Sequence, residues 1–150
     1  MRLTLAAIGR LRRGPEKALV DDYLDRFARA GRGLGLPPVA VAEVEGRPSE
    51  AEALARAIPA GAALCVLDER GTLATSPELA DLLARHRDDA RDLCFAVGGA
   101  DGLDPALRDR ADHALAFGRM VWPHMLARVM LAEQLYRAAS ILAGAPYHRA

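Results

Sequence analysis

The most informative stretch of the sequence is Leu93-Cys94-Phe95-Ala96-Val97-Gly98-Gly99-Ala100-Asp101-Gly102, because an apolar run stops there abruptly at a glycine-rich loop. Residues 93–97 show no polar alternation, which is typical of a strand buried on both faces of a parallel sheet. The two adjacent glycines allow positive φ and the close approach of a ligand. Open α/β sheets bind ligands at the carboxyl ends of their strands. The stretch therefore predicts a central strand followed by a candidate binding loop.

Strand and helix patterns alternate on both sides of this stretch. Besides 93–97, strands are predicted over 3–9, 38–44, 62–67 and 113–117, with a turn at 68–71. Helices are predicted to run from Pro15 to about Ala30, from the cap Ser49 to about Ile58, from the N-cap Ser76, from Asp104-Pro105, and from Pro123 to about Ala143. Alternating strands and helices predict an α/β fold, a mainly parallel sheet with helices on both faces. We expect a single domain over residues 1–150.

The last helix is apolar over an unusually wide arc, formed by Met125, Leu126, Val129, Met130, Leu131, Leu135, Tyr136, Ile141 and Leu142. One core-facing stripe usually needs less apolar surface than this. The helix is therefore either buried between two layers of one chain or in contact with a second subunit.

Composition bounds the class of function. The chain has 51% hydrophobic residues, 27% charged residues and a net charge of zero, which is ordinary for a globular protein. Its apolar start lacks the design of a signal peptide, and no apolar run approaches the ~20 residues that span a bilayer. We expect a cytoplasmic protein without a membrane or DNA partner. Neutrality counts mildly against free RNA, because RNA affinity usually depends on phosphate neutralisation.

Several chemistries have no matching motif. The sequence holds no G-x-G-x-x-G, no G-K-[ST] and no G-x-S-x-G, so NAD, ATP and serine-nucleophile chemistry are set aside. The four histidines do not follow metal-ligand spacing, and no metal is expected. Cys65 and Cys94 stand inside apolar runs and are predicted to be buried thiols. Chemistry in this chain would rely on a bound cofactor and on positioning.

Three loops and the tail are the candidate functional segments. The loops are residues 68–71, 98–102 and 117–124, each after a predicted strand. The tail Pro146-Tyr147-His148-Arg149 carries an aromatic ring that can stack on a base, an imidazole that titrates near neutrality and an arginine suited to phosphate. The alternative for the tail is a segment that only packs against the fold.

Together, these segments resemble the ribosomal RNA large subunit methyltransferase H family of the SPOUT class. The similar segments are 22–26, 67–71, 95–103, 117–120, 123–124, 128–129, 133–138 and 144–149. Each motif is weak alone, but their order, their spacing and the terminal Tyr-His-Arg make the combination specific.

The resemblance implies a SPOUT fold with a C-terminal trefoil knot, a homodimer, and S-adenosyl-L-methionine (SAM) as methyl donor without a metal. It implies methylation of N3 of pseudouridine 1915 in 23S rRNA within the assembled ribosome. The cofactor contacts that it implies are Leu67, Gly98, Gly99, Phe117, Gly118, Arg119, Met120, Val121 and Trp122.

For catalysis, we take His148 and Arg149 as candidates to assist the loss of the N3 proton, with Tyr147 stacking on or orienting the base. Arg128 and His124 are secondary candidates for RNA or dimer contacts. Whether the tail serves its own cofactor pocket or that of a partner subunit stays open. The rival hypotheses are another RNA target such as a tRNA, a non-catalytic ribosome-binding factor, and a regulatory dimer that binds a small ligand.

Overall fold

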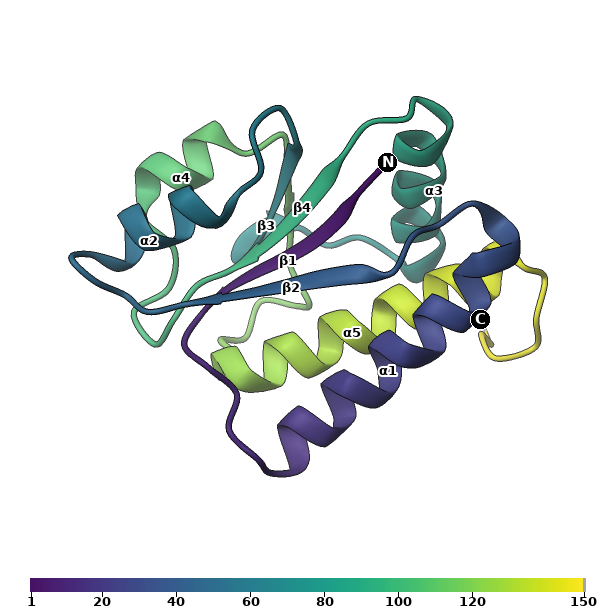
Figure 1. Ribbon diagram of the computed structural model, residues 1–150, viewed down its shortest axis with the longest axis horizontal. Helices are drawn as coiled ribbons and strands as arrows, with labels where there is room; N and C mark the ends of the chain where they lie inside the picture. The colour runs from purple at the N-terminus through teal and green to yellow at the C-terminus, as the bar shows by residue number, and fades with distance from the viewer. Residues whose placement is uncertain (150) are drawn as a thin grey trace.

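The computed structural model describes residues 1–149 and contains a five-stranded, all-parallel sheet with strand order β2-β1-β4-β3-β5 (Figure 1). The strands are β1 (Leu3–Ile8), β2 (Val39–Val44), β3 (Ala63–Thr72), β4 (Leu93–Val97) and β5 (His113–Leu115). The helices are α1 (Pro15–Gly31), α2 (Glu50–Ala57), α3 (Ser76–Asp88), α4 (Pro105–Arg110) and α5 (His124–Leu142), with a short 3₁₀ helix η1 (Arg32–Leu34). The predicted α/β class and parallel sheet are confirmed.

Helices cover both faces of the sheet (Figure 1). On β4, Leu93, Phe95 and Val97 belong to the cluster that α1, α3 and α5 cover, whereas Cys94 and Ala96 belong to the cluster that α2 and α4 cover. This alternation follows from the two-residue period of a strand. Strand β4 is fully buried and pairs with β1 on one side and β3 on the other, as predicted for the central strand. The trefoil knot stays a prediction.

Two predicted boundaries are wrong. Strand β3 does not end at Leu67: its pairing with β5 shifts register and resumes at Thr72, where both Leu67 and Thr72 oppose Leu115. Residues 68–71, predicted as a turn, are thus an irregular part of the strand. Strand β5 ends at Leu115 rather than Phe117, because the chain leaves the ladder there to form the next loop.

The N-cap of α3 is also corrected. Thr75, not Ser76, caps this helix: its hydroxyl accepts from the backbone N–H of Glu78, and its own N–H donates to the Glu78 carboxylate at 2.6 Å. The physical reason is the S/T-x-x-E spacing of a capping box, which Thr75 and Glu78 satisfy. Ser76 is freed to donate its hydroxyl to Oε1 of Gln134 on α5 at 2.6 Å. Within residues 1–149, the apolar length of every helix falls short of what a membrane span requires.

Acidification should destabilise the fold through two histidines. The Nε2 atoms of His86 on α3 and His113 on β5 lie 3.2 Å apart, and burial lowers the pKa of both imidazoles. Unfolded histidine titrates near about 6.5. The folded chain therefore binds fewer protons than the unfolded chain just below that pH, and the free energy of unfolding falls as the pH falls. Urea unfolding at about pH 7.5 and about pH 5.5 measures the loss. His86→Phe should reduce it; an equal loss in that variant would contradict the assignment.

Candidate functional site

A cavity of about 650 Å³ opens at the carboxyl edge of the sheet, where the chain segments that follow β4 and β5 meet the irregular part of β3 and the start of α5. Its lining residues come from these four segments: Leu67, Asp68, Glu69, Val97, Gly98, Gly99, Ala100, Asp101, Gly102, Leu103, Leu115, Ala116, Phe117, Gly118, Met120, Val121, Trp122, Pro123, His124 and Ala127. This volume lies in the range of about 300–1,000 Å³ that small-molecule sites occupy.

The glycine loop is tightly folded. The backbone N–H of Gly102 donates to the carbonyl of Gly99 at 3.0 Å, and Gly102 has a φ of +79°. A Cβ atom on Gly98 would lie 2.6 Å from the carbonyl oxygen of Gly102. Both Gly98 and Gly99 are buried. The loop therefore requires glycine at 98 and offers backbone groups, rather than side chains, to a ligand.

The cavity has an acidic rim and an apolar wall. Asp68, Glu69 and Asp101 line it, and none of the lining residues within 1–149 is a lysine or an arginine. Met120, Val121 and Trp122 form part of the apolar wall on the side of α5. Carboxylates beside an apolar wall favour a ligand with a positive charge and an aromatic or aliphatic body, and they disfavour a phosphate.

Eight of the nine predicted cofactor contacts line this one cavity: Leu67, Gly98, Gly99, Phe117, Gly118, Met120, Val121 and Trp122. Arg119 is exposed and is not among the lining residues. His124, predicted to contact RNA or a second subunit, also lines the cavity. The prediction missed three carboxylates that line the cavity: Asp68, Glu69 and Asp101. Each belongs to a segment that was predicted as a candidate site because it follows a predicted strand, and this position was the signal that could have identified them.

Arg128, predicted to contact RNA or a dimer partner, lies buried within its own chain. Its side chain is only 1% exposed. The guanidinium donates to Oε2 of Glu43 at 2.8 Å, to the carbonyl of Ile8 at 2.9 Å and to that of Gly9 at 2.8 Å. Arg128 thus ties α5 to the carboxyl ends of β1 and β2. The physical reason is that Arg128 lies on the buried face of α5, so its side chain points into the protein rather than towards solvent.

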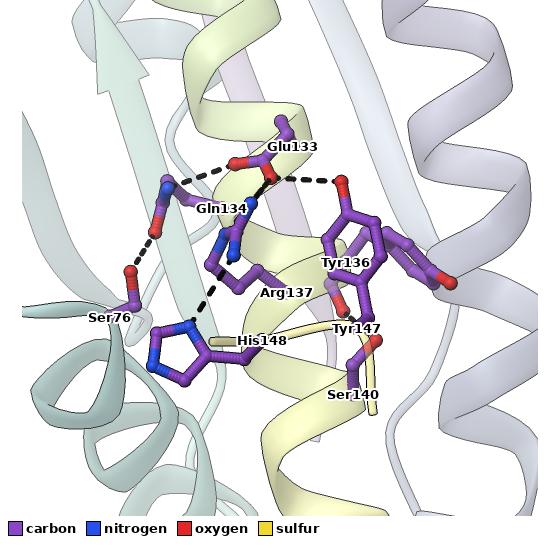
Figure 2. Close-up of polar contacts among 8 residues, drawn as sticks. All are labelled: Ser76, Glu133, Gln134, Tyr136, Arg137, Ser140, Tyr147 and His148. Atoms are coloured by element: carbon purple, nitrogen blue, oxygen red, sulfur yellow. Dashed lines mark hydrogen bonds and ion pairs between the residues drawn. The ribbon is translucent and has the colours of Figure 1, made fainter. Parts of the chain in front are cut away.

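The tail does not reach the cavity of its own chain. The hydroxyl of Tyr147 donates to the carboxylate of Glu133, and Nδ1 of His148 lies 3.4 Å from Nη1 of Arg137 (Figure 2). Neither tail residue is among those that line the cavity, and Arg149 is exposed. The predicted cofactor and catalytic residues therefore occupy separate places on one chain.

An apolar patch borders the cavity. We define it as Met120, Val121, Trp122, Met125 and Leu126, all exposed large hydrophobic residues. Val121 is 77% exposed and Met120 is 74% exposed, which is unusual for adjacent large apolar side chains. Contiguous exposed apolar surface of this kind marks a binding or association site.

The remaining chemistry of the chain is sparse. Cys65 and Cys94 are free and buried, as predicted, and burial raises their thiol pKa values to about 12 and about 11. Thiols in this state are poor nucleophiles. Within residues 1–149 no group of three or more histidine, cysteine, aspartate or glutamate side chains is arranged to hold a metal ion.

Comparisons with known proteins agree over the whole chain. A family model described as "Predicted SPOUT methyltransferase" matches residues 1–148. The protein named ribosomal RNA large subunit methyltransferase H from Paracoccus denitrificans is 66% identical over 154 residues, covering 99% of both chains. A protein of the same name from Dinoroseobacter shibae is 62% identical over 155 residues, again covering 99% of both chains.

Solved structures share the fold at low sequence identity. A probable methyltransferase from Bordetella pertussis Tohama I superposes with a TM-score of 0.52 at 16% identity, covering 92% of this chain and 94% of that one. A probable methylase family protein from Haemophilus influenzae Rd KW20 gives 0.53 at 13% identity, covering 99% of this chain and 70% of that one. These similarities concern the fold alone.

Proposed function

Because the chain belongs to the SPOUT methyltransferase family, we propose that it uses SAM to methylate N3 of pseudouridine 1915 in 23S rRNA of the assembled ribosome. The observation that carries the proposal is the meeting of eight predicted cofactor contacts around one cavity. The names of its full-length relatives support a large-subunit ribosomal RNA as the substrate. That substrate in turn supports a cytoplasmic site of action. We also propose that residues 1–150 act as one methyltransferase domain.

The residues around the cavity fit SAM. The apolar wall that includes Met120, Val121 and Trp122 suits the adenine ring, and the backbone of residues 98–102 suits its polar edge. The carboxylates of Glu69 and Asp101 complement the positive charges of a sulfonium and an ammonium group, whereas Asp68 already forms an ion pair with Arg108 at 3.5 Å. Bound SAM supplies an activated methyl group on a sulfonium, so the reaction needs no metal.

The task left to the protein is orientation and control of one proton. Holding two reactants in line can contribute up to about 7–11 kcal/mol. The N3 proton of pseudouridine must leave before N3 can attack, and the resulting negative charge is shared with the ring carbonyl oxygens. Hydrogen-bond donors near those oxygens would stabilise that charge. We assign this role to His148 and Arg149, with Tyr147 orienting the base.

We propose a homodimer in which the tail of one subunit completes the cavity of the other. The separation of tail and cavity within one chain supports this arrangement. The apolar patch at 120–126 supports association beside the cavity. Docking of a dimer onto a structured particle would also suit a chain of zero net charge, because shape and stacking then replace part of the phosphate contacts.

The direct test uses tritiated SAM and 70S ribosomes from a strain that lacks this modification, followed by mass spectrometry of the labelled RNA. We expect label at N3 of a single pseudouridine in 23S rRNA. Label in a tRNA would favour a different RNA target. SAM binding without any label would also indicate another substrate, and absence of SAM binding would favour a non-catalytic ribosome-binding factor.

Gly98→Ala should weaken SAM binding at least about tenfold, because close approach of the backbone to a ligand depends on this loop. The added Cβ would lie 2.6 Å from the Gly102 carbonyl oxygen, so the loop must shift. Isothermal titration calorimetry measures the dissociation constant.

The matched control is Gly33→Ala, where a Cβ meets nothing within 4 Å. Its SAM affinity should equal that of the unaltered protein. Equal affinities in all three proteins would place the cofactor somewhere other than this loop.

A further inference from the structure

Glu133 on α5 is the centre of a hydrogen-bonded cluster that joins the tail to two helices (Figure 2). Its Oε1 atom accepts from the Tyr147 hydroxyl at 3.0 Å and from Nε of Arg137 at 3.0 Å, and Nη2 of Arg137 donates to the same oxygen. Its Oε2 atom accepts from Nε2 of Gln134 at 2.9 Å, and Gln134 accepts from Ser76 on α3. Hydrogen bonds thus hold both oxygens of the carboxylate, and through them Glu133 connects α5 to the tail and, by way of Gln134, to α3.

Arg137 contacts both aromatic residues of the tail. Its guanidinium carbon lies 4.8 Å from the centroid of the Tyr147 ring, a distance at which a cation attracts the ring face. Its Nη1 atom lies 3.4 Å from Nδ1 of His148. The side-chain hydrogen bonds to Glu133 raise the pKa of Arg137 above its ordinary value. The guanidinium therefore stays charged and donates only.

The contact with Arg137 favours one tautomer of the neutral His148 ring. A guanidinium has five N–H donors and no acceptor, so Nδ1 of His148 can take part only as an acceptor. An imidazole whose Nδ1 accepts is neutral and carries its proton on Nε2. His148 held in this way offers a hydrogen-bond donor at Nε2.

Tyr147 is held as a phenol. Its ring lies 4.6 Å from that of Tyr136, centroid to centroid. Burial, followed by the hydrogen bond to Glu133, raises the pKa of Tyr147 to about 12. The hydroxyl therefore keeps its proton at neutral pH and does not act as a base.

We propose that Glu133 and Arg137 are positioning residues for methyl transfer: they anchor Tyr147 and His148 on α5 and set His148 as the Nε2–H tautomer, a donor to the carbonyl oxygens of the target base. This inference rests on the proposed function. In the reaction, the N3 proton leaves to solvent, and the negative charge left on N3 spreads to the ring carbonyl oxygens, where the His148 donor stabilises it. N3 then forms a bond to the methyl carbon as the carbon–sulfur bond breaks, giving the neutral methylated base and S-adenosylhomocysteine.

The test uses two single variants of the full-length protein, Arg137→Met and Glu133→Gln. Arg137→Met removes the group that faces Nδ1, and Glu133→Gln removes the charge that holds Arg137 and Tyr147. Nitrogen-15 NMR of the His148 ring reports the tautomer without any substrate. The SAM dissociation constant and kcat on ribosomes lacking the modification complete the set. Arg29→Met is the matched control, because it removes another i,i+4 ion pair, that with Asp25 on α1.

We expect the unaltered protein and Arg29→Met to show His148 mainly as the Nε2–H tautomer. Arg137→Met should show a mixture of tautomers. Arg137→Met and Glu133→Gln should each lower kcat at least about tenfold, because misplacing a catalytic group by ~1 Å lowers the rate on the order of a hundredfold. SAM affinity should stay within about twofold of that of the unaltered protein, since neither Glu133 nor Arg137 lines the cofactor cavity.

An unchanged tautomer in Arg137→Met, or an unchanged kcat in both folded variants, would overturn the inference. If Arg137→Met does not fold, the kcat of Glu133→Gln, compared with that of Arg29→Met, tests the inference. A different pattern marks failure of the proposed function: the unaltered protein would show the Nε2–H tautomer but methylate no ribosome. That result would exclude a role of Glu133 and Arg137 in methyl transfer and leave their contacts with the tail as a structural feature.

Discussion

Truncating the chain after Pro146 should reduce methyl transfer by about 10²–10⁴-fold, the usual contribution of a positioned proton-handling group. The truncation removes Tyr147, His148 and Arg149, the candidates for stabilising the charge on the target base. None of the three lines the cavity of its own chain, and across the dimer they are proposed to act on the target base rather than on the cofactor, so the dissociation constant for SAM should not change. Single-turnover methylation of ribosomes and calorimetric SAM titration measure the two quantities. Full methylation by the truncated protein would exclude a catalytic role for the tail.

Mixed dimers separate action within a chain from action across the dimer. One subunit carries the truncation and an intact cavity; the other carries Gly98→Ala and an intact tail. If the tail serves the partner subunit, one of the two composite sites is complete and activity returns. If the tail serves its own chain, both sites lack a part, and at a SAM concentration well below the dissociation constant of Gly98→Ala the activity of the mixed dimer does not exceed that of the Gly98→Ala homodimer. Homodimers of each variant are the controls.

Arg128→Met should lower the free energy of unfolding by about 3–5 kcal/mol, the cost of removing one partner from a buried ion pair. The substitution removes three hydrogen bonds and leaves the carboxylate of Glu43 and the carbonyls of Ile8 and Gly9 without this donor. Methionine has a similar length, so loss of packing contributes less. Folded domains have only about 5–15 kcal/mol of stability, so the variant would lose a large share of it.

Urea unfolding monitored by circular dichroism measures this loss. Arg29→Met is again the appropriate comparison, because its exposed ion pair with Asp25 contributes only about 0–1 kcal/mol. A loss in Arg128→Met no greater than that in Arg29→Met would show that the buried guanidinium is not a structural tie between α5 and the ends of β1 and β2.

Local sequence patterns were sufficient for most of the fold. The unbroken apolar run 93–97 identified the central strand with the boundaries that the structure has, because a strand buried on both faces leaves no place for polar residues. Proline and cap residues located the starts of α1, α2 and α4. The segments 68–71, 98–102 and 117–124 were predicted as candidate sites, and residues from all three line one cavity, since it opens at the carboxyl edge that the parallel strands share.

The tertiary structure decided what depends on partners distant in sequence. Arg128 looks like any exposed arginine until Glu43, 85 residues away, and the end of β1 are placed around it. The extension of β3 to Thr72 depends on its pairing with Leu115, and the tail lies on Glu133 and Arg137 rather than at the cavity of its own chain. The elements, the sheet and the binding edge were therefore predictable from the sequence, because they follow from local periodicity and capping. Only the packed structure decided which charges are buried and where the tail lies, because those outcomes depend on desolvation and on contacts between residues far apart in the chain.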